Sequence, residues 1–115
     1  MIRALDVAAL AEIATGVALL VVPSFIGEVL LGEMLIGAAI PTARVAGLAL
    51  IALGIACWRN APLLGMLTYS MAATAYLGYV AAAGVFAGVL LWPAVAAHAV
   101  LSVFLCRDWL KTDID

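Results

Sequence analysis

The stretch DVAALAEIATGVALLVVP, residues Asp6 to Pro23, places a carboxyl group, that of Glu12, in the middle of an apolar run. About 20 apolar residues are enough for a helix to cross the hydrocarbon core of a bilayer. A charge at the centre of such a helix costs about 2.5–3.5 kcal/mol. Glu12 must therefore be neutral, or face away from lipid, or lie outside a membrane span.

The composition of the whole chain favours a membrane protein. Of its 115 residues, 69% are hydrophobic and 10% are charged, whereas soluble domains have about 45–50% apolar and about 25% charged residues. A chain of this length has too little interior to hide so much apolar surface from water. We therefore expect a single integral membrane domain over residues 1–115, with the lipid bilayer as its main contact.

Four apolar segments are long enough to span a bilayer, at residues 4–22, 42–58, 63–83 and 85–106. We interpret the first segment as a retained helix and not a cleaved signal peptide, because Asp6 and Glu12 interrupt its apolar part. A closed barrel would need alternating polar and apolar residues, which this sequence lacks. The sequence predicts an all-α, four-helix transmembrane bundle.

The connector between the first two spans begins with PSFIGEVLLGE, residues 23–33. Ser24 can cap a short helix over residues 25–31, with Glu28 outward and Phe25, Val29 and Leu30 toward lipid. Such a helix would lie at the membrane interface. The alternative is an ordered loop.

The positions of the basic residues predict the orientation. With four spans, the N-terminus, the second loop and the C-terminus share one side of the membrane. Cytoplasmic loops carry an excess of Lys and Arg, which places both termini in the cytoplasm. The shared side holds four of the five basic residues, namely Arg3, Arg59, Arg107 and Lys111.

Four polar side chains fall at one depth of the predicted bundle. Glu12 lies nine residues inside the basic end of the first span, and His98 lies nine residues inside the basic end of the last. At about 1.5 Å per residue, both are about 13 Å deep. Tyr69 and Ser70 in the third span reach a similar depth. We therefore predict that Glu12 meets His98 in an intramembrane polar site that includes Tyr69 and Ser70.

Small and hydroxyl residues recur at helical spacing, which is typical of helix contacts in membranes. Thr15, Tyr76 and Ser102 on these faces are secondary candidates for the polar site. The stripes are Ala8, Glu12, Thr15 and Gly16 in the first span, Gly47 and Gly54 in the second, Ser70, Thr74 and Gly78 in the third, and Ala94, His98, Ser102 and Cys106 in the fourth.

The pairing of Glu12 with His98 has three open interpretations. A neutral hydrogen bond would stabilise the bundle by about 0.6 kcal/mol and at most about 2 kcal/mol. A proton-sensitive or ligand-binding site is the second, since ionisable groups inside membranes mark functional sites. In the third, the two residues do not meet and Glu12 faces a partner subunit.

Two further residues carry expectations. Arg44 begins the second span and can pair with Glu33 or Glu28, bind a lipid phosphate or be solvated. Pro93 lies inside the predicted fourth span. There it should free the carbonyl of Val89 and kink the helix.

The remaining motifs exclude several classes of function. Cys57 and Cys106 have no CxxC or Cys/His ligand spacing, so we predict no metal site. They are expected to be inert thiols, with a redox pair as the alternative. No basic run indicates nucleic-acid binding. The sequence contains no catalytic triad pattern and no Gly-rich phosphate loop, which favours a non-enzyme and names no cofactor.

Arg3, GVALLVVPSF at residues 16–25 and ARVAGLALIALGIACW at residues 43–58 resemble the DoxX-like group of small four-helix membrane proteins, in particular its DUF4345-like members. The resemblance implies a four-helix bundle, which we expect in a bacterial inner membrane. Some members of the group resemble small subunits of thiosulfate–quinone oxidoreductases, and others resemble helpers in redox-cofactor maturation. No residue of this chain matches a defined active site of the group.

Three functions remain open from the sequence. The first is a non-catalytic subunit or accessory protein of a membrane complex. The second is a small ion- or proton-coupled transporter or channel, formed by a homo-oligomer with Glu12, His98 and Tyr69 along its path. The third is a quinone- or lipid-binding redox-associated protein, in which His98 and Tyr76 donate hydrogen bonds to a carbonyl group.

Overall fold

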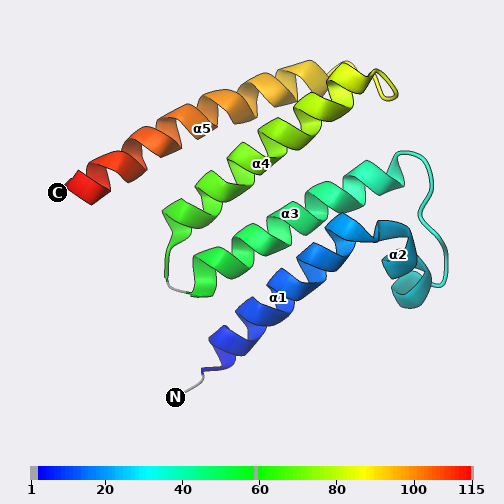
Figure 1. The fold of residues 1–115 in the computed structure, drawn as a ribbon, viewed down its shortest axis with the longest axis horizontal. Coiled ribbons are helices and arrows are strands. Elements are labelled where there is room, and N and C mark those ends of the chain that lie inside the picture. The colour runs from blue at the N-terminus through cyan, green and yellow to red at the C-terminus, as the bar shows by residue number, and fades with distance from the viewer. Residues whose placement is uncertain (1–2, 59, 115) are drawn as a thin grey trace.

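The computed structural model describes residues 3–58 and 60–114, and in this part of the chain it contains five helices and no strand. Four of them, α1, α3, α4 and α5, are long and apolar enough to cross a membrane. The predicted all-α class and the four candidate spans are thus confirmed. The helices are α1 (Ala4–Val21), α2 (Pro23–Leu31), α3 (Ala39–Trp58), α4 (Pro62–Ala83) and α5 (Leu91–Ile114) (Figure 1).

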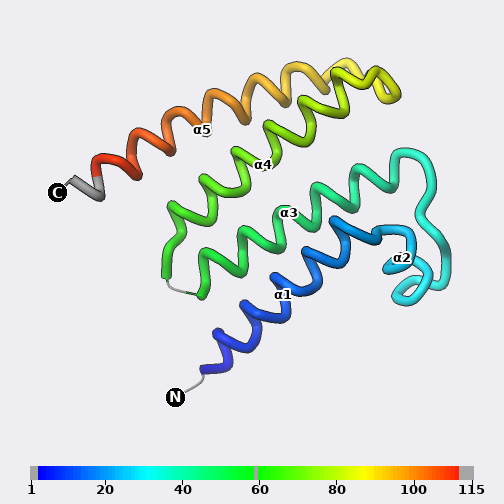
Figure 2. The backbone as a smooth tube through the Cα atoms, in the orientation of Figure 1, coloured from blue at the N-terminus to red at the C-terminus, as the bar shows by residue number. Residues whose placement is uncertain are grey.

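The four long helices lie side by side in a layer, in the order α1, α3, α4, α5 (Figure 2). The shortest extent of the molecule is 16 Å, against 46 Å and 37 Å in the other directions. Within the described residues, α1 contacts α2 and α3 but neither α4 nor α5. The structure therefore differs from the predicted bundle, in which the first and last spans were expected to meet, because each long helix packs only on its neighbours in this order.

The short helix α2 is two residues longer than predicted and begins differently. Pro23 occupies its first turn, where the missing N–H has no helical partner to lose. Ser24 is therefore not the cap, and its hydroxyl donates a hydrogen bond to the carbonyl of Leu35, 2.9 Å away. Gly32 ends α2 in the left-handed conformation at φ 83°.

The last helix begins six residues later than predicted. Gly84 ends α4 in the left-handed conformation at φ 75°, and residues 85–90 form a turn. Pro93 is consequently in the first turn of α5, where a proline interrupts no helical hydrogen bond. The kink predicted at Pro93 was wrong for this reason, since the carbonyl of Val89 lies before the helix.

Glycines bring α1 and α3 into backbone contact. A Cβ atom added to Gly47 would lie 2.6 Å from the carbonyl oxygen of Gly16, and one added to Gly54 would lie 2.7 Å from that of Ala9. Because no side chain fits between the two helices at these points, Gly47 and Gly54 form the groove that the sequence predicted. We call this contact the α1–α3 seam.

The face that α1 presents to α3 is rotated relative to the predicted stripe. Ala9 is 2% exposed and Gly16 is buried, whereas Ala8 and Thr15 are exposed. Thr15 donates its hydroxyl to the carbonyl of Ala11 on its own helix. Thr15 is therefore no part of an inward polar face, and Glu12 lies at the margin of the seam, half-buried.

At the other side of the layer, between α4 and α5, side chains rather than glycines make most of the contact. Ser70 is 1% exposed and Ala73 is completely buried. A Cβ atom on Gly78 would sit 3.8 Å from the Val95 side chain, which is ordinary van der Waals distance. Gly78 thus faces α5, but the two helices approach less closely there than α1 and α3 do in the seam.

Candidate functional site

Two of the predicted site residues meet at the contact between α4 and α5. The rings of Tyr69 and His98 lie with their centroids 5.8 Å apart at an interplanar angle of 69°. This edge-to-face geometry is favourable for aromatic pairs. Ser70, the next residue on α4, is buried. The structure thus brings Tyr69 and His98 together, as their shared depth predicted.

The tautomer of the neutral His98 ring follows from its hydrogen bond. Nδ1 lies 2.8 Å from the carbonyl oxygen of Ala94, one turn earlier on α5. A carbonyl only accepts hydrogen bonds, so Nδ1 carries the proton. In the neutral ring, Nε2 is then an acceptor with a free lone pair. His98 therefore cannot donate a hydrogen bond from Nδ1 to a ligand. In the sequence-based hypothesis, His98 donated to a carbonyl group, whereas the neutral ring seen here can only accept at Nε2.

A cavity of about 440 Å³ lies between α3, α4 and α5. Tyr69, His98 and Thr42 are the residues on its wall whose side chains end in polar groups. The hydroxyl of Thr42 donates to the carbonyl of Ala38, 2.8 Å away. Apolar side chains form most of the remaining wall, among them Val45, Val80, Phe86 and Leu91.

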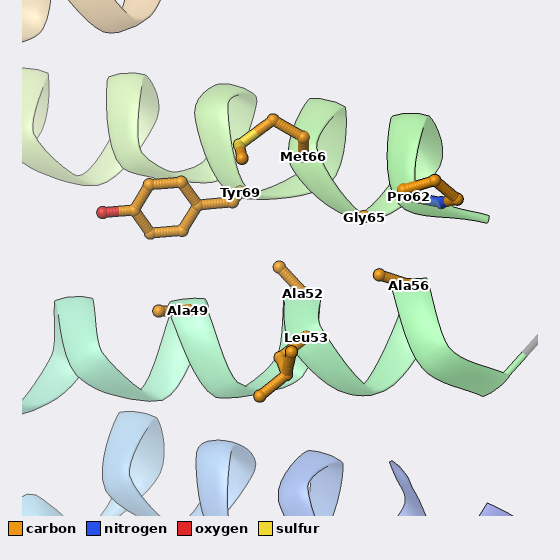
Figure 3. A pocket seen from close by; sticks show the side chains of 8 residues that line it. All are labelled: Ala49, Ala52, Leu53, Ala56, Pro62, Gly65, Met66 and Tyr69. Carbon is orange, nitrogen blue, oxygen red and sulfur yellow. The ribbon is translucent and has the colours of Figure 1, made fainter. Parts of the chain in front are cut away.

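A second cavity of about 400 Å³ lies between α3 and α4 near Pro62, and its wall is almost wholly apolar (Figure 3). Tyr69 lines this cavity as well as the first. In Figure 3 its hydroxyl points away from Pro62 and along α3, past Ala49. The N-terminal part of α3 and the first cavity lie in that direction. Tyr69 thus lines both cavities, and its hydroxyl is directed toward the part of α3 that lines the first cavity with His98.

Glu12 does not meet His98, and this prediction was wrong. The two residues lie on α1 and α5, which are the two edges of the layer, with α3 and α4 between them. Equal depth placed both residues at one level but did not determine which helices are neighbours. Within residues 3–58 and 60–114, no hydrogen bond or ion pair reaches the Glu12 carboxyl group.

The secondary candidates lie apart from the two cavities. Tyr76 is half-buried and lines neither of them. Ser102 donates its hydroxyl to the carbonyl of His98 within α5. Arg44 forms none of the predicted ion pairs, and instead its Nε donates to the carbonyl of Leu20 at 3.2 Å. The cavity that His98 lines is thus also lined by Tyr69 and not by Tyr76.

The cysteines do not form a redox pair in this structure. Cys57 lies on α3 and Cys106 on α5, both as free thiols, and these two helices make no contact within the described residues. The described part of the chain contains no group of three or more His, Cys, Asp or Glu side chains that could hold a metal ion.

Thr42 and Phe86 were not foreseen as part of a site. Thr42 was assigned only as the start of a span, and Phe86 was placed inside the fourth helix, whereas it lies in the turn before α5. The one signal in the sequence is Gly84 ahead of VFAGVL, which permits a left-handed helix end.

The four long apolar helices define this chain as a multi-pass membrane protein. No protein-family model, no curated protein and no solved structure matches it. The resemblance to DoxX-like proteins consequently remains a prediction from the quoted residues.

Proposed function

We propose that the protein is a non-catalytic subunit or accessory protein of an inner-membrane complex, with both termini in the cytoplasm. The observation that carries this proposal is the Glu12 carboxyl group. It is half-buried in the middle of a candidate span and has no partner within the described residues. Polar groups at such depth are costly unless another group pairs with them. A helix of a partner protein would supply that group.

The position of α1 supports the same proposal. It is an edge helix, so one side packs on α3 while the other is free to meet another protein. Val7, Leu10 and Val17 on α1 are exposed. Lipid can cover these apolar side chains, but its acyl chains cannot form a hydrogen bond with the Glu12 carboxyl group.

Photocrosslinking in native membranes tests this proposal. A photoreactive amino acid would replace Ala8, which is exposed and one turn before Glu12. We expect one discrete protein adduct, identified by mass spectrometry as the same membrane protein in repeated preparations. The control position is Leu101 on the exposed face of α5, at the opposite edge of the layer, where this adduct should be absent. Adducts to lipid alone from both positions would refute the proposal.

Glu12→Gln and Glu12→Leu identify the group responsible. Glu12→Leu should abolish the adduct, since leucine cannot accept a hydrogen bond, whereas Glu12→Gln should retain part of it. The matched control is Glu28→Gln on the exposed surface of α2, which should leave the adduct unchanged. An unchanged adduct in Glu12→Leu would show that the carboxyl group is not the docking contact.

The same experiment separates the subunit from the homo-oligomeric transporter. Adducts between two copies of this chain would overturn the proposed role in a mixed complex and favour the transporter. Proton flux in liposomes that disappears in Glu12→Gln would then support that alternative.

A further inference from the structure

We propose that the cavity beside Tyr69 and His98 binds a neutral, lipid-soluble alcohol, whose hydroxyl group lies between the Tyr69 hydroxyl and Nε2 of His98. This inference goes beyond the proposed subunit role and does not depend on it, because Glu12 lies at the other edge of the layer.

The size and wall of the cavity suit a small amphipathic ligand. Its volume of about 440 Å³ falls within the range of about 300–1,000 Å³ found for ligand pockets, which are mostly apolar with a few placed polar groups. The wall fits that description, since Val45, Val80 and Phe86 surround Tyr69 and His98. A ligand with a long apolar part and a single polar group would match both features.

The two polar groups differ in the hydrogen bond that each can offer. The Tyr69 hydroxyl makes no hydrogen bond within the described residues, so it is free to donate. In neutral His98, Nδ1 donates a hydrogen bond to the carbonyl of Ala94, so Nε2 is free to accept one. Thr42 already donates its proton to Ala38. The cavity therefore presents one free donor and one free acceptor on neighbouring rings.

This pair of groups selects a hydroxyl over other polar groups. A hydroxyl both donates and accepts, so it satisfies Tyr69 and His98 together. A carbonyl or an ether only accepts, which leaves Nε2 of His98 without a partner. A carboxylate or phosphate would bring a charge into the middle of a candidate span, at a cost that one tyrosine does not offset.

The second cavity explains why the polar group of the ligand should lie on the His98 side of Tyr69. Near Pro62, the wall is almost wholly apolar, and Figure 3 shows the Tyr69 hydroxyl directed away from it. That space can hold any acyl chain without selection. Selectivity for a hydroxyl can arise only where the Tyr69 hydroxyl and the His98 ring are both within reach.

Equilibrium binding to the full chain in nanodiscs tests the inference, with empty nanodiscs as the blank. The probes are tritiated geranylgeraniol and its methyl ether, in which a methyl group replaces the hydroxyl proton. We expect the alcohol to bind about three- to tenfold more tightly than the ether, the factor for one hydrogen bond. Competition by hexadecan-1-ol would show whether the site takes linear alcohols or only isoprenoid ones.

Two variants assign the effect to the proposed groups. His98→Phe should reduce the preference for the alcohol to about one- to twofold, because only the alcohol donates to Nε2. Tyr69→Phe should weaken the binding of alcohol and ether alike by about three- to tenfold, because both accept from the Tyr69 hydroxyl. The melting temperature shows that both variants remain folded. Tyr79→Phe is the matched control, since Tyr79 is 70% exposed on the same helix and should leave the preference unchanged. Equal binding of alcohol and ether to the wild type, an unchanged preference in His98→Phe, or unchanged affinity for both ligands in Tyr69→Phe would overturn the inference.

Discussion

The α1–α3 seam and the α4–α5 contact hold neighbouring helices together in different ways. In the seam, Gly47 and Gly16 let the two backbones touch, and a Cβ atom on Gly47 would lie 2.6 Å from a carbonyl oxygen. Around α4, the Tyr69 ring meets the His98 ring 5.8 Å away, and cavities remain beside them. The distance between α1 and α3 is set by the absence of side chains at the glycines. The distance between α4 and α5 is set by the shape of the side chains between them.

This difference separates a rigid part of the molecule from an adaptable one. Backbone atoms in the seam have no rotamers with which to adjust, so added volume must push α1 away from α3. Side chains beside a cavity can move into it. A ligand site is therefore expected next to α4, and a fixed docking edge is expected at α1.

The largest effect is expected from Gly47→Ala in the seam. The new methyl group would meet the Gly16 carbonyl oxygen at 2.6 Å, so we expect the free energy of unfolding to fall by about 3 kcal/mol. Reversible unfolding in mixed micelles, followed by circular dichroism, measures it. Gly88→Ala is the control, because a Cβ atom there has no neighbour within 4 Å. Equal stability of the two variants would show that the α1–α3 seam can accept a side chain at Gly47.

A smaller loss is expected from Gly65→Ala at the contact of α3 with α4. Its Cβ atom would lie 2.7 Å from the carbonyl oxygen of Ala52, but the cavity near Pro62 adjoins this point and gives α4 room to shift. We expect the unfolding free energy to fall by about 2 kcal/mol in the same assay. A loss as large as that of Gly47→Ala would show that the cavity does not relieve the clash.

The ring contact should contribute about 1 kcal/mol, the usual value for an edge-to-face pair. A double-mutant cycle with Tyr69→Leu and His98→Leu measures this coupling in the unfolding free energy. The control cycle combines Tyr79→Leu with His98→Leu. Tyr79 is exposed and should show no coupling to His98. Zero coupling in the first cycle would mean that the two rings do not stabilise the α4–α5 contact.

The smallest effect, and one of opposite sign, is expected from Gly78→Ala between α4 and α5. Its Cβ atom would lie 3.8 Å from the Val95 side chain, without a clash. Alanine also favours the helix over glycine, so the unfolding free energy should rise by about 0.5 kcal/mol. A fall of the size expected for Gly65→Ala would show that α4 and α5 are packed as tightly as the seam.

Much of the fold was predictable because apolar runs of about 20 residues are typical of membrane-spanning helices. The limits of α4 fell within one residue of the prediction, and Gly47 and Gly54 were correctly placed in a groove. The beginning of α5 was missed because VFAGVL, residues 85–90, is as apolar as the helix that follows it. Hydropathy alone does not distinguish an apolar turn from an apolar helix.

The candidate site was only half predictable. The depth of a residue follows from its distance along one helix, so the common level of Tyr69 and His98 was visible in the sequence. The order of the helices in the layer is a property of the whole chain, and the Glu12–His98 pair failed there. The helical phase of α1 was also missed, since Ala8 and Ala9 are chemically identical and only Ala9 faces α3.

The hydrogen bond from Arg44 to Leu20 fixes the longitudinal register of α1 on α3. Leu20 lies in the last turn of α1, where carbonyl groups have no partner within the helix and attract cations. Glycines set how closely two helices approach but allow one to slide along the other, whereas a guanidinium bound to a single carbonyl does not. Arg44 thus opposes sliding at one end of the α1–α3 seam, and a lysine in its place would stabilise this alignment less.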